Sequence, residues 1–261
     1  MDDQVLYEKN WVTEIIKTLK LFAEKVNSFV NWANENQDSI NRYFVAFGNL
    51  LQWQSAVNKL SEKQIVFTDV WTKDLIERVN AAETAEKFIL EYYTEDENVR
   101  LQSLITRCGK AKQVSEYKKL YPQIVIAAEM GCYHLACLGM FTLEDGILSD
   151  ITGDAKSTSF QKRIKQLENK INEKLPLSDV DLQTWTIIVS FERFEDTAFG
   201  SSDFNRVEPE YMNRHWTLHG RSRREYTKAD YIKMLLSLDA LVFMVSLTEE
   251  TENIEEKTDE L

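Results

Sequence analysis

Apolar side chains recur at intervals of three and four residues along the first fifty positions, and this spacing constrains the fold more than any other feature of the sequence. It places the apolar side chains on one face of an α-helix. The polar stretch 34–38 separates two such runs, which are Ile15, Leu19, Phe22, Val26, Phe29 and Ala33, then Ile40, Tyr43, Phe47 and Leu50. We expect a helical hairpin or one long bent helix here, used for oligomerisation or partner binding.

Residues that interrupt regular structure are scarce along the whole chain. Its 261 residues include 8 glycines and 3 prolines, which leaves few turns and favours long helices over a many-stranded sheet. An apolar fraction of 43% is enough for a packed core. The sequence therefore predicts an all-α fold, with a helical bundle in the C-terminal half preceded by a long amphipathic helical region.

The middle of the chain suggests where domains divide. Helices are expected over Asp74–Glu91 and Glu97–Arg107, after a brief extended segment at 63–71, and residues 108–112 have the composition of a linker. We expect an N-terminal helical region (1–112), used for oligomerisation or partner binding, and a helical domain (113–248). We also expect an acidic disordered tail (249–261), in which seven acids and one lysine supply −6 of the net charge of −12.

The predicted C-terminal helices are bounded by proline, glycine and capping residues. One helix begins at Pro122 and breaks at Gly131; a second ends at Gly153; further helices cover 160–175 and 181–199. Thr227 and Asp230 have the spacing of a capping box for the last helix. The most apolar stretch, 234–247, is too short to span a membrane and indicates a buried helix.

The amino-terminal sequence and the cysteines indicate a cytoplasmic location. No apolar run follows the acidic amino terminus, so no secretory signal is expected. The three cysteines (Cys108, Cys132 and Cys137) form no Cys-x-x-Cys motif and cannot all pair, which favours reduced thiols. We expect a cytoplasmic protein without membrane association.

A basic, histidine-bearing stretch stands out in this acidic chain. Between Arg214 and Lys233 there are six basic residues and two acidic ones, and two of the chain's three histidines, His215 and His219, lie at its start. Pro209 is a suitable first residue for a helix and Gly220 a suitable terminator, so a short helix is expected over 210–218.

Arg214 and His219 are five residues apart, and this spacing resembles the Arg-(polar)-x3-His signature of HEPN domains. The phrase Asn213-Arg214-His215…Leu218-His219-Gly220 is similar to that of Abi- and Apea-type bacterial HEPN proteins. A leucine-rich helix (231–238) follows it, and residues 131–148 are similar to the family's first helical pair. The resemblance covers roughly residues 115–247.

The resemblance implies an up-and-down helical bundle and metal-independent RNA cleavage without a cofactor. His219 would transfer protons and Arg214 would stabilise charge on the phosphate, which suits imidazole and guanidinium chemistry. Asn213, His215 and Asp145 would support the site. Arg221, Arg223 and Arg224 would hold the RNA backbone. The family's sites usually combine two protomers, so a homodimer is expected, and its phage-defence and toxin members suggest a cognate antitoxin or defence-system subunit as partner.

Two alternatives remain open on sequence grounds. HEPN domains also serve as non-catalytic nucleotide-binding, assembly or regulatory modules, and the acidic composition counts against affinity for free RNA. A metal site is the other alternative, because His215 and His219 have ligand spacing on a helix and Glu192, Glu195 or Asp196 could complete it.

Overall fold

A computed structural model of the chain describes residues 24–25, 51–153, 160–174 and 181–249. These residues form helices, turns and loops with no β-strand among them, which confirms the predicted all-α fold. The chain divides into two units, Met1–Leu51 and Gln52–Leu261, and the second contains nearly all the described residues. The amphipathic runs before residue 51 and the acidic residues 250–261 lie outside the described residues, apart from two helical positions.

The second unit opens with helical residues 52–61 and a buried connecting segment. Ile65, Val66 and Phe67 are buried in this segment, which lies within the stretch 63–71 that was expected to be extended and is neither helix nor strand at these three residues. The amide of Phe67 donates to the Ser190 hydroxyl at 2.9 Å. This bond fastens the connecting segment to a helix more than a hundred residues later in the chain.

Two helices replace the single helix expected over Asp74–Glu91. They are α3 (Lys73–Ala81) and α4 (Ala85–Lys110). The prediction was wrong because Ala82 takes an extended backbone conformation after α3. The Thr84 hydroxyl then accepts the amide of Lys87 at 3.3 Å and starts α4.

Helix α4 is kinked between residues 95 and 98. Asp96, Glu97 and Asn98 have positive φ angles of 50°, 57° and 64°, which non-glycine residues rarely adopt. Arg100 stabilises the kink by donating to the carbonyl of Tyr92 at 2.9 Å. The sequence placed a gap between two helices close to this position, and the structure confirms a break there, because residues 95–98 leave helical geometry and separate two helical stretches within α4.

Helices α5 (Lys112–Ser115), α6 (Leu120–Glu129) and α7 (Tyr133–Thr152) follow in close succession. Gly131 separates the last two with a φ of 77°, and the amide of Cys132 donates to the carbonyl of Ala127 at 2.8 Å. This is the hydrogen-bond pattern of a Schellman turn, which ends α6. The predicted break at Gly131 is therefore confirmed, while α6 begins two residues before the expected Pro122.

A second glycine lets α6 and α7 approach each other closely. A Cβ atom at Gly139 would lie 2.6 Å from Cγ1 of Ile124, so any larger residue would push the two helices apart. Gly153 ends α7 with a φ of 63°, as the sequence predicted.

The remaining helices are α8 (Phe160–Lys174), α9 (Leu182–Ala198), α10 (Arg214–Leu218) and α11 (Lys228–Glu249). Asp181 caps α9 by accepting the amide of Thr184 at 2.8 Å. The predicted capping box of α11 is confirmed, because Asp230 accepts the Thr227 amide at 2.9 Å and donates its own amide to the Thr227 hydroxyl at 3.4 Å.

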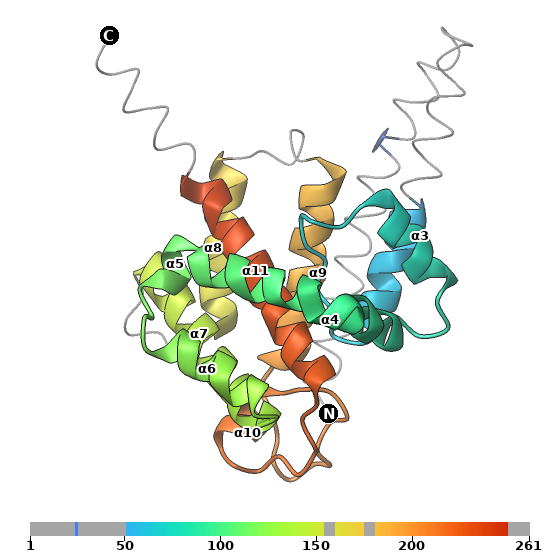
Figure 1. Cartoon of the computed structure of the whole chain (residues 1–261). Helices are drawn as coiled ribbons and strands as arrows, with labels where there is room; N and C mark the ends of the chain where they lie inside the picture. The colour runs from blue at the N-terminus through green and yellow to red at the C-terminus, as the bar shows by residue number, and fades with distance from the viewer. Residues whose placement is uncertain (1–23, 26–50, 154–159, 175–180, 250–261) are drawn as a thin grey trace, which may run out of the picture. The chain divides into compact units, whose positions relative to one another are not determined.

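Helix α11 forms the centre of the core and packs against α4, α7, α8 and α9 (Figure 1). It is buried on nearly every side, and each fully buried leucine contributes about 1.5–3 kcal/mol of transfer free energy. The predicted buried helix over 234–247 is thus confirmed, although α11 is longer, at 22 residues. By length and composition it is the one described helix able to cross a membrane, and 78% of its most apolar window is buried inside the protein.

The predicted domain boundary at 112/113 falls inside α5. Helix α4, on the N-terminal side of that position, packs directly against α11 on the other side. The described residues from Gln52 to Glu249 therefore belong to one compact unit, and the division found in the chain lies between residues 51 and 52.

Candidate functional site

The His-bearing helix α10 is shorter than expected, because Asn213 rather than Pro209 begins it. The Asn213 side-chain oxygen accepts the amides of His215 at 3.0 Å and Trp216 at 3.3 Å. Its amide group donates to the carbonyls of Thr197 and Gly200. Asn213 is buried and its side chain is engaged in these hydrogen bonds, so it holds α10 in position and does not face a substrate.

Gly220 ends α10, as the sequence predicted. Its φ is 62°, and its amide donates to the carbonyl of Thr217 at 3.1 Å. The amide of Arg221 donates to the carbonyl of Trp216 at 2.9 Å, which completes a Schellman turn. The turn brings Arg221 back beside the helix that it has just left.

Gln64 anchors the loop before α10, and nothing in the local sequence pointed to it. Its side chain accepts the amide of Met212 at 2.7 Å and donates to the carbonyl of the same residue at 2.9 Å. It also donates to the Thr197 hydroxyl. Gln64 is buried and has a φ of 55°, and it ties the backbone just ahead of Asn213 to the connecting segment of the fold.

His215 lies within α10 and His219 immediately follows it, and their rings are near each other in an edge-on arrangement. Their ring centroids are 6.1 Å apart, with His219 exposed and His215 half-buried. Burial lowers the pKa of His215, and the positive charge of Arg214 and the neighbouring His219 lower it further. His215 is therefore predominantly neutral at pH 7, with a lone pair able to accept a proton.

Arg214 points to Asp145 on α7. One nitrogen of its guanidinium lies 2.9 Å from Oδ2 of Asp145, and Arg163 lies 2.7 Å from Oδ1. Arg163 also donates to the Ser149 hydroxyl at 2.6 Å. The Arg214 side chain is 21% exposed, so part of it faces solvent beside the imidazoles. The structure thus brings the predicted residue Asp145 into direct contact with Arg214.

Behind this ion-pair network lie two buried carboxyl groups, Glu144 on α7 and Glu195 on α9. Glu144 accepts the Ser237 hydroxyl at 3.2 Å, and neither oxygen of Glu195 has a hydrogen-bond partner among the described residues. Burial raises the pKa of both groups well above the ordinary range. The charges of Glu144 and Asp145 raise the pKa of Glu195 further, and Arg214 lowers it.

The three arginines after α10 have different surroundings. Arg221 and Arg223 are exposed. Arg224 lies 3.0 Å from the buried Asp230 and over the ring of Tyr226, so its charge is directed into the protein. Glu208 accepts the Ser222 hydroxyl and the amide of Arg223, which closes the loop before α10 onto the loop after it.

The third histidine also lies near α10, which the sequence did not indicate. The ring of His134, at the start of α7, packs edge-on against Tyr226 with centroids 4.7 Å apart. The Tyr226 hydroxyl in turn shares a hydrogen bond with Thr217 of α10. His134 therefore supports α10 through Tyr226. Its ring does not contact the rings of His215 and His219, so the three histidines do not form a cluster.

The predicted residues do not assemble into a metal site within the described part of the chain. No group of three or more His, Cys, Asp or Glu side chains there has a metal-binding arrangement. Glu195, one of the carboxylates considered as a ligand for His215 and His219, is buried in the core. The two imidazoles thus lack a third ligand from these residues.

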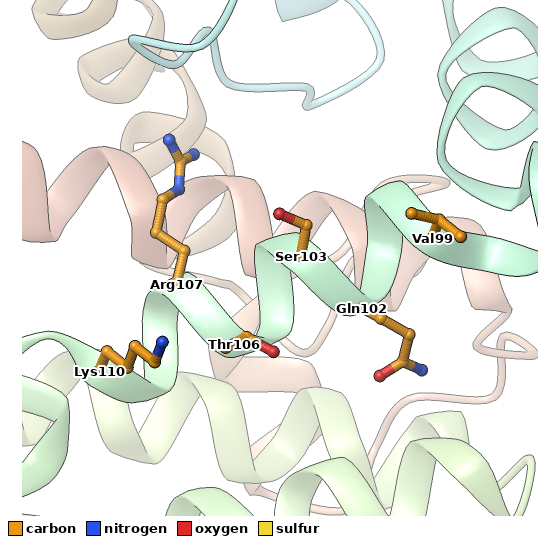
Figure 2. Close-up of a pocket in the computed structure, with 6 residues that line it drawn as sticks. All are labelled: Val99, Gln102, Ser103, Thr106, Arg107 and Lys110. Atoms are coloured by element: carbon orange, nitrogen blue, oxygen red, sulfur yellow. The ribbon is translucent and has the colours of Figure 1, made fainter.

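A shallow hollow of about 530 Å³ lies along α4, away from the residues discussed above (Figure 2). Its lining residues are Val99, Gln102, Ser103, Thr106, Arg107 and Lys110. Arg107 and Gln102 point to opposite sides of the helix in Figure 2, and Arg107 is paired with Asp69 and Asp239. The hollow therefore gathers no converging set of reactive groups.

Comparison with known proteins returns no family model, curated protein or solved structure that matches this chain.

Proposed function

We propose that this chain is a HEPN-type, metal-independent endoribonuclease whose site contains Arg214 and His219, completed by a second copy of the chain. The observation that carries the proposal is the pair of imidazoles 6.1 Å apart at the end of α10, one exposed and one half-buried. Arg214 precedes them, and the exposed Arg221 and Arg223 follow. These are proton-transfer groups beside phosphate-binding groups.

In the proposed reaction the ribose 2′-oxygen attacks the adjacent phosphorus. An imidazole accepts the 2′-hydroxyl proton, and a second protonated imidazole gives a proton to the departing 5′-oxygen. The products are a 2′,3′-cyclic phosphate and a 5′-hydroxyl end. Guanidinium groups stabilise the negative charge that develops on the non-bridging oxygens. His219 is the principal proton-transfer group, and the neutral form of His215 is available as a second one.

Within one chain Arg214 is paired with Asp145, and a separation of five residues places Arg214 and His219 roughly 140° apart around a helix, so they face different directions. A second copy would bring another set of the same groups, so that a phosphodiester can contact Arg214 from one protomer and His219 from the other. The proposal therefore requires a dimer in solution.

The decisive experiment compares RNA cleavage by the wild type, His219→Ala and Arg214→Ala at equal dimer concentration. Loss of a proton-transfer group should lower the rate by about 10²–10⁴-fold. His134→Phe is the matched control, since it removes a histidine near α10 but retains a ring against Tyr226 and should cleave at nearly the wild-type rate. EDTA should have no effect, and a 2′-deoxy substrate should stay intact.

Product ends provide a second readout, because mass spectrometry should detect the cyclic phosphate. Expression of the wild type should slow growth, and both alanine variants should relieve this. If a verified dimer leaves single-stranded and structured RNA intact, or if His219→Ala cleaves as fast as wild type, catalysis must be abandoned.

One observation favours a second candidate, a non-catalytic nucleotide-binding or assembly module. Arg214 is held in an ion pair with Asp145, a carboxylate that the buried Arg163 also binds. A module of this kind would bind a nucleotide or a partner protein with no turnover, and the cleavage assay distinguishes the two functions.

A further inference from the structure

An aromatic and cationic cluster adjoins the exposed histidine. The ring of Phe204 lies 5.3 Å from that of Trp216 and 5.4 Å from that of His219, measured between centroids, and meets both edge-on. The Arg221 guanidinium lies over the Phe204 ring, 4.8 Å from its centroid. We call Phe204, Trp216, His219 and Arg221 the Phe204 cluster. Its histidine and arginine are exposed, and its two other rings are half-buried.

Both loops that carry the cluster are fixed by hydrogen bonds. The Schellman turn at Gly220 returns Arg221 to α10, as its bond to the carbonyl of Trp216 shows. In the other loop, Asp203 accepts the amide of Asn205 at 2.9 Å, which makes a tight turn around Phe204. Glu208 joins the two loops through Ser222 and Arg223. The cluster is therefore built before any ligand arrives, so ordering it costs little on binding.

We propose that the Phe204 cluster is the subsite for one unpaired nucleobase of single-stranded RNA, next to the bond cleaved in the proposed function on which this inference rests. Proteins bind splayed-out bases by stacking them on aromatic rings and on arginine planes. The exposed guanidinium of Arg221, backed by Phe204, offers such a plane. A base stacked there lies beside His219, so its phosphate is next to the proton-transfer group.

The arrangement also predicts which nucleic acids are poor ligands. A base within a duplex has both faces covered by its neighbours and cannot stack on a protein ring without being unstacked first. A backbone without bases can contact Arg221 and Arg223 only through its charge. Single-stranded RNA should therefore bind better than a duplex or an abasic strand, and only the single strand should depend on the aromatic ring of Phe204.

The experiment measures binding of labelled, non-cleavable 2′-O-methyl oligonucleotides to the full chain by fluorescence anisotropy. The probes are a single strand of eight nucleotides, its abasic equivalent and its duplex. Phe204→Leu removes the ring and should weaken single-strand binding about ten-fold or more. Phe204→Tyr keeps the ring and should bind like wild type. Arg221→Lys keeps the charge but removes the plane, and should weaken the single strand while sparing the abasic probe.

The abasic probe separates base stacking from other effects of the substitution. Phe204→Leu should leave its binding unchanged, because no base is present to stack. The proposal is overturned if Phe204→Leu weakens binding of both probes equally, or if it leaves single-strand binding unchanged. Absence of binding to every probe by the wild type also overturns it. Circular dichroism checks that each variant folds.

The outcomes also distinguish this subsite from the catalytic proposal. Base-dependent binding that requires Phe204, without any RNA cleavage, would support the subsite and end the ribonuclease proposal. Cleavage that requires His219, together with single-strand binding that is unchanged by Phe204→Leu, would support the ribonuclease proposal and end the subsite proposal.

Discussion

Arg214 and Asp145 form an ion pair of 2.9 Å between α10 and α7, two segments 69 residues apart in the sequence. The same carboxylate binds Arg163, whose side chain is 7% exposed. Asp145 is therefore shared between one buried and one half-buried guanidinium group. This pairing attaches the His-bearing helix to the body of the helical unit, so one carboxyl group supports both the fold and the candidate site.

Replacing Asp145 with asparagine should destabilise the protein by about 2–4 kcal/mol, because its ion pairs with Arg214 and with the buried Arg163 would both be lost in a poorly solvated place. Asp150→Asn is the matched control on the same helix. Asp150 is exposed and accepts the Tyr117 hydroxyl at 2.8 Å, which an amide oxygen can also do, so the loss should stay below about 1 kcal/mol. Urea unfolding at pH 7 measures both, and equal losses would contradict this account.

Gly220→Ala should destabilise the protein by about 1–2 kcal/mol, because residue 220 has a left-handed backbone conformation that alanine adopts only at a cost. A Cβ atom at this position would meet no atom within 4 Å, so no clash adds to the cost. Gly220→Asn should cost less than alanine, since asparagine tolerates positive φ better. Thermal unfolding of the three proteins tests the order glycine, asparagine, alanine, and an alanine variant as stable as wild type would show that the turn is not strained.

Local features of the fold could be predicted from the sequence because their causes lie within a few residues. The capping box of Thr227 and Asp230 and the turns at Gly131 and Gly220 all depend on near neighbours. The start of α10 was missed although Asn213 is a strong N-cap residue, because Pro209 offered a competing start. The groups that stabilise this start are not local. Gln64, which holds Met212, is distant in the sequence, and the fold brings the carbonyls of Thr197 and Gly200 to the Asn213 side chain.

The candidate site was predictable in its residue types but not in its surroundings. The spacing of Arg214 and His219 and the position of Asp145 could be taken from the motif, whereas the pairing of Asp145 with Arg163 depends on how α7 and α8 pack. Glu144 gave one usable signal, since the residues three and four positions away on either side, among them Phe141 and Leu148, are apolar and place it on the buried face of the helix. Glu195 gave none, because it stands among other acidic residues that suggest a solvated face.

His215 should titrate below the ordinary histidine pKa of 6.5, because burial and the charge of Arg214 disfavour its protonated form. Arg214→Gln should raise this pKa towards 6.5. Proton NMR of the imidazole C–H signals follows both, with His215→Gln used for assignment. His134→Phe is the control and should leave the His215 titration unchanged. A midpoint at or above 6.5 in the wild type would mean that His215 is more solvated than the structure indicates.

Stability should fall as pH rises above the ordinary glutamate pKa of 4.5, because Glu195 and Glu144 have raised pKa values in the folded protein. In that window the folded state binds more protons than the unfolded state, so each group lowers the unfolding free energy by up to about 1.4 kcal/mol per pH unit until its folded pKa is passed. Glu195→Gln removes the ionisable group and should be more stable than wild type at pH 8, with a shallower slope. Glu173→Gln, at an exposed position of α8, should keep the wild-type slope. Urea unfolding from pH 5 to 8 measures the slopes, and identical curves for the Glu195 variant and wild type would mean that this carboxyl is charged and solvated in the folded protein.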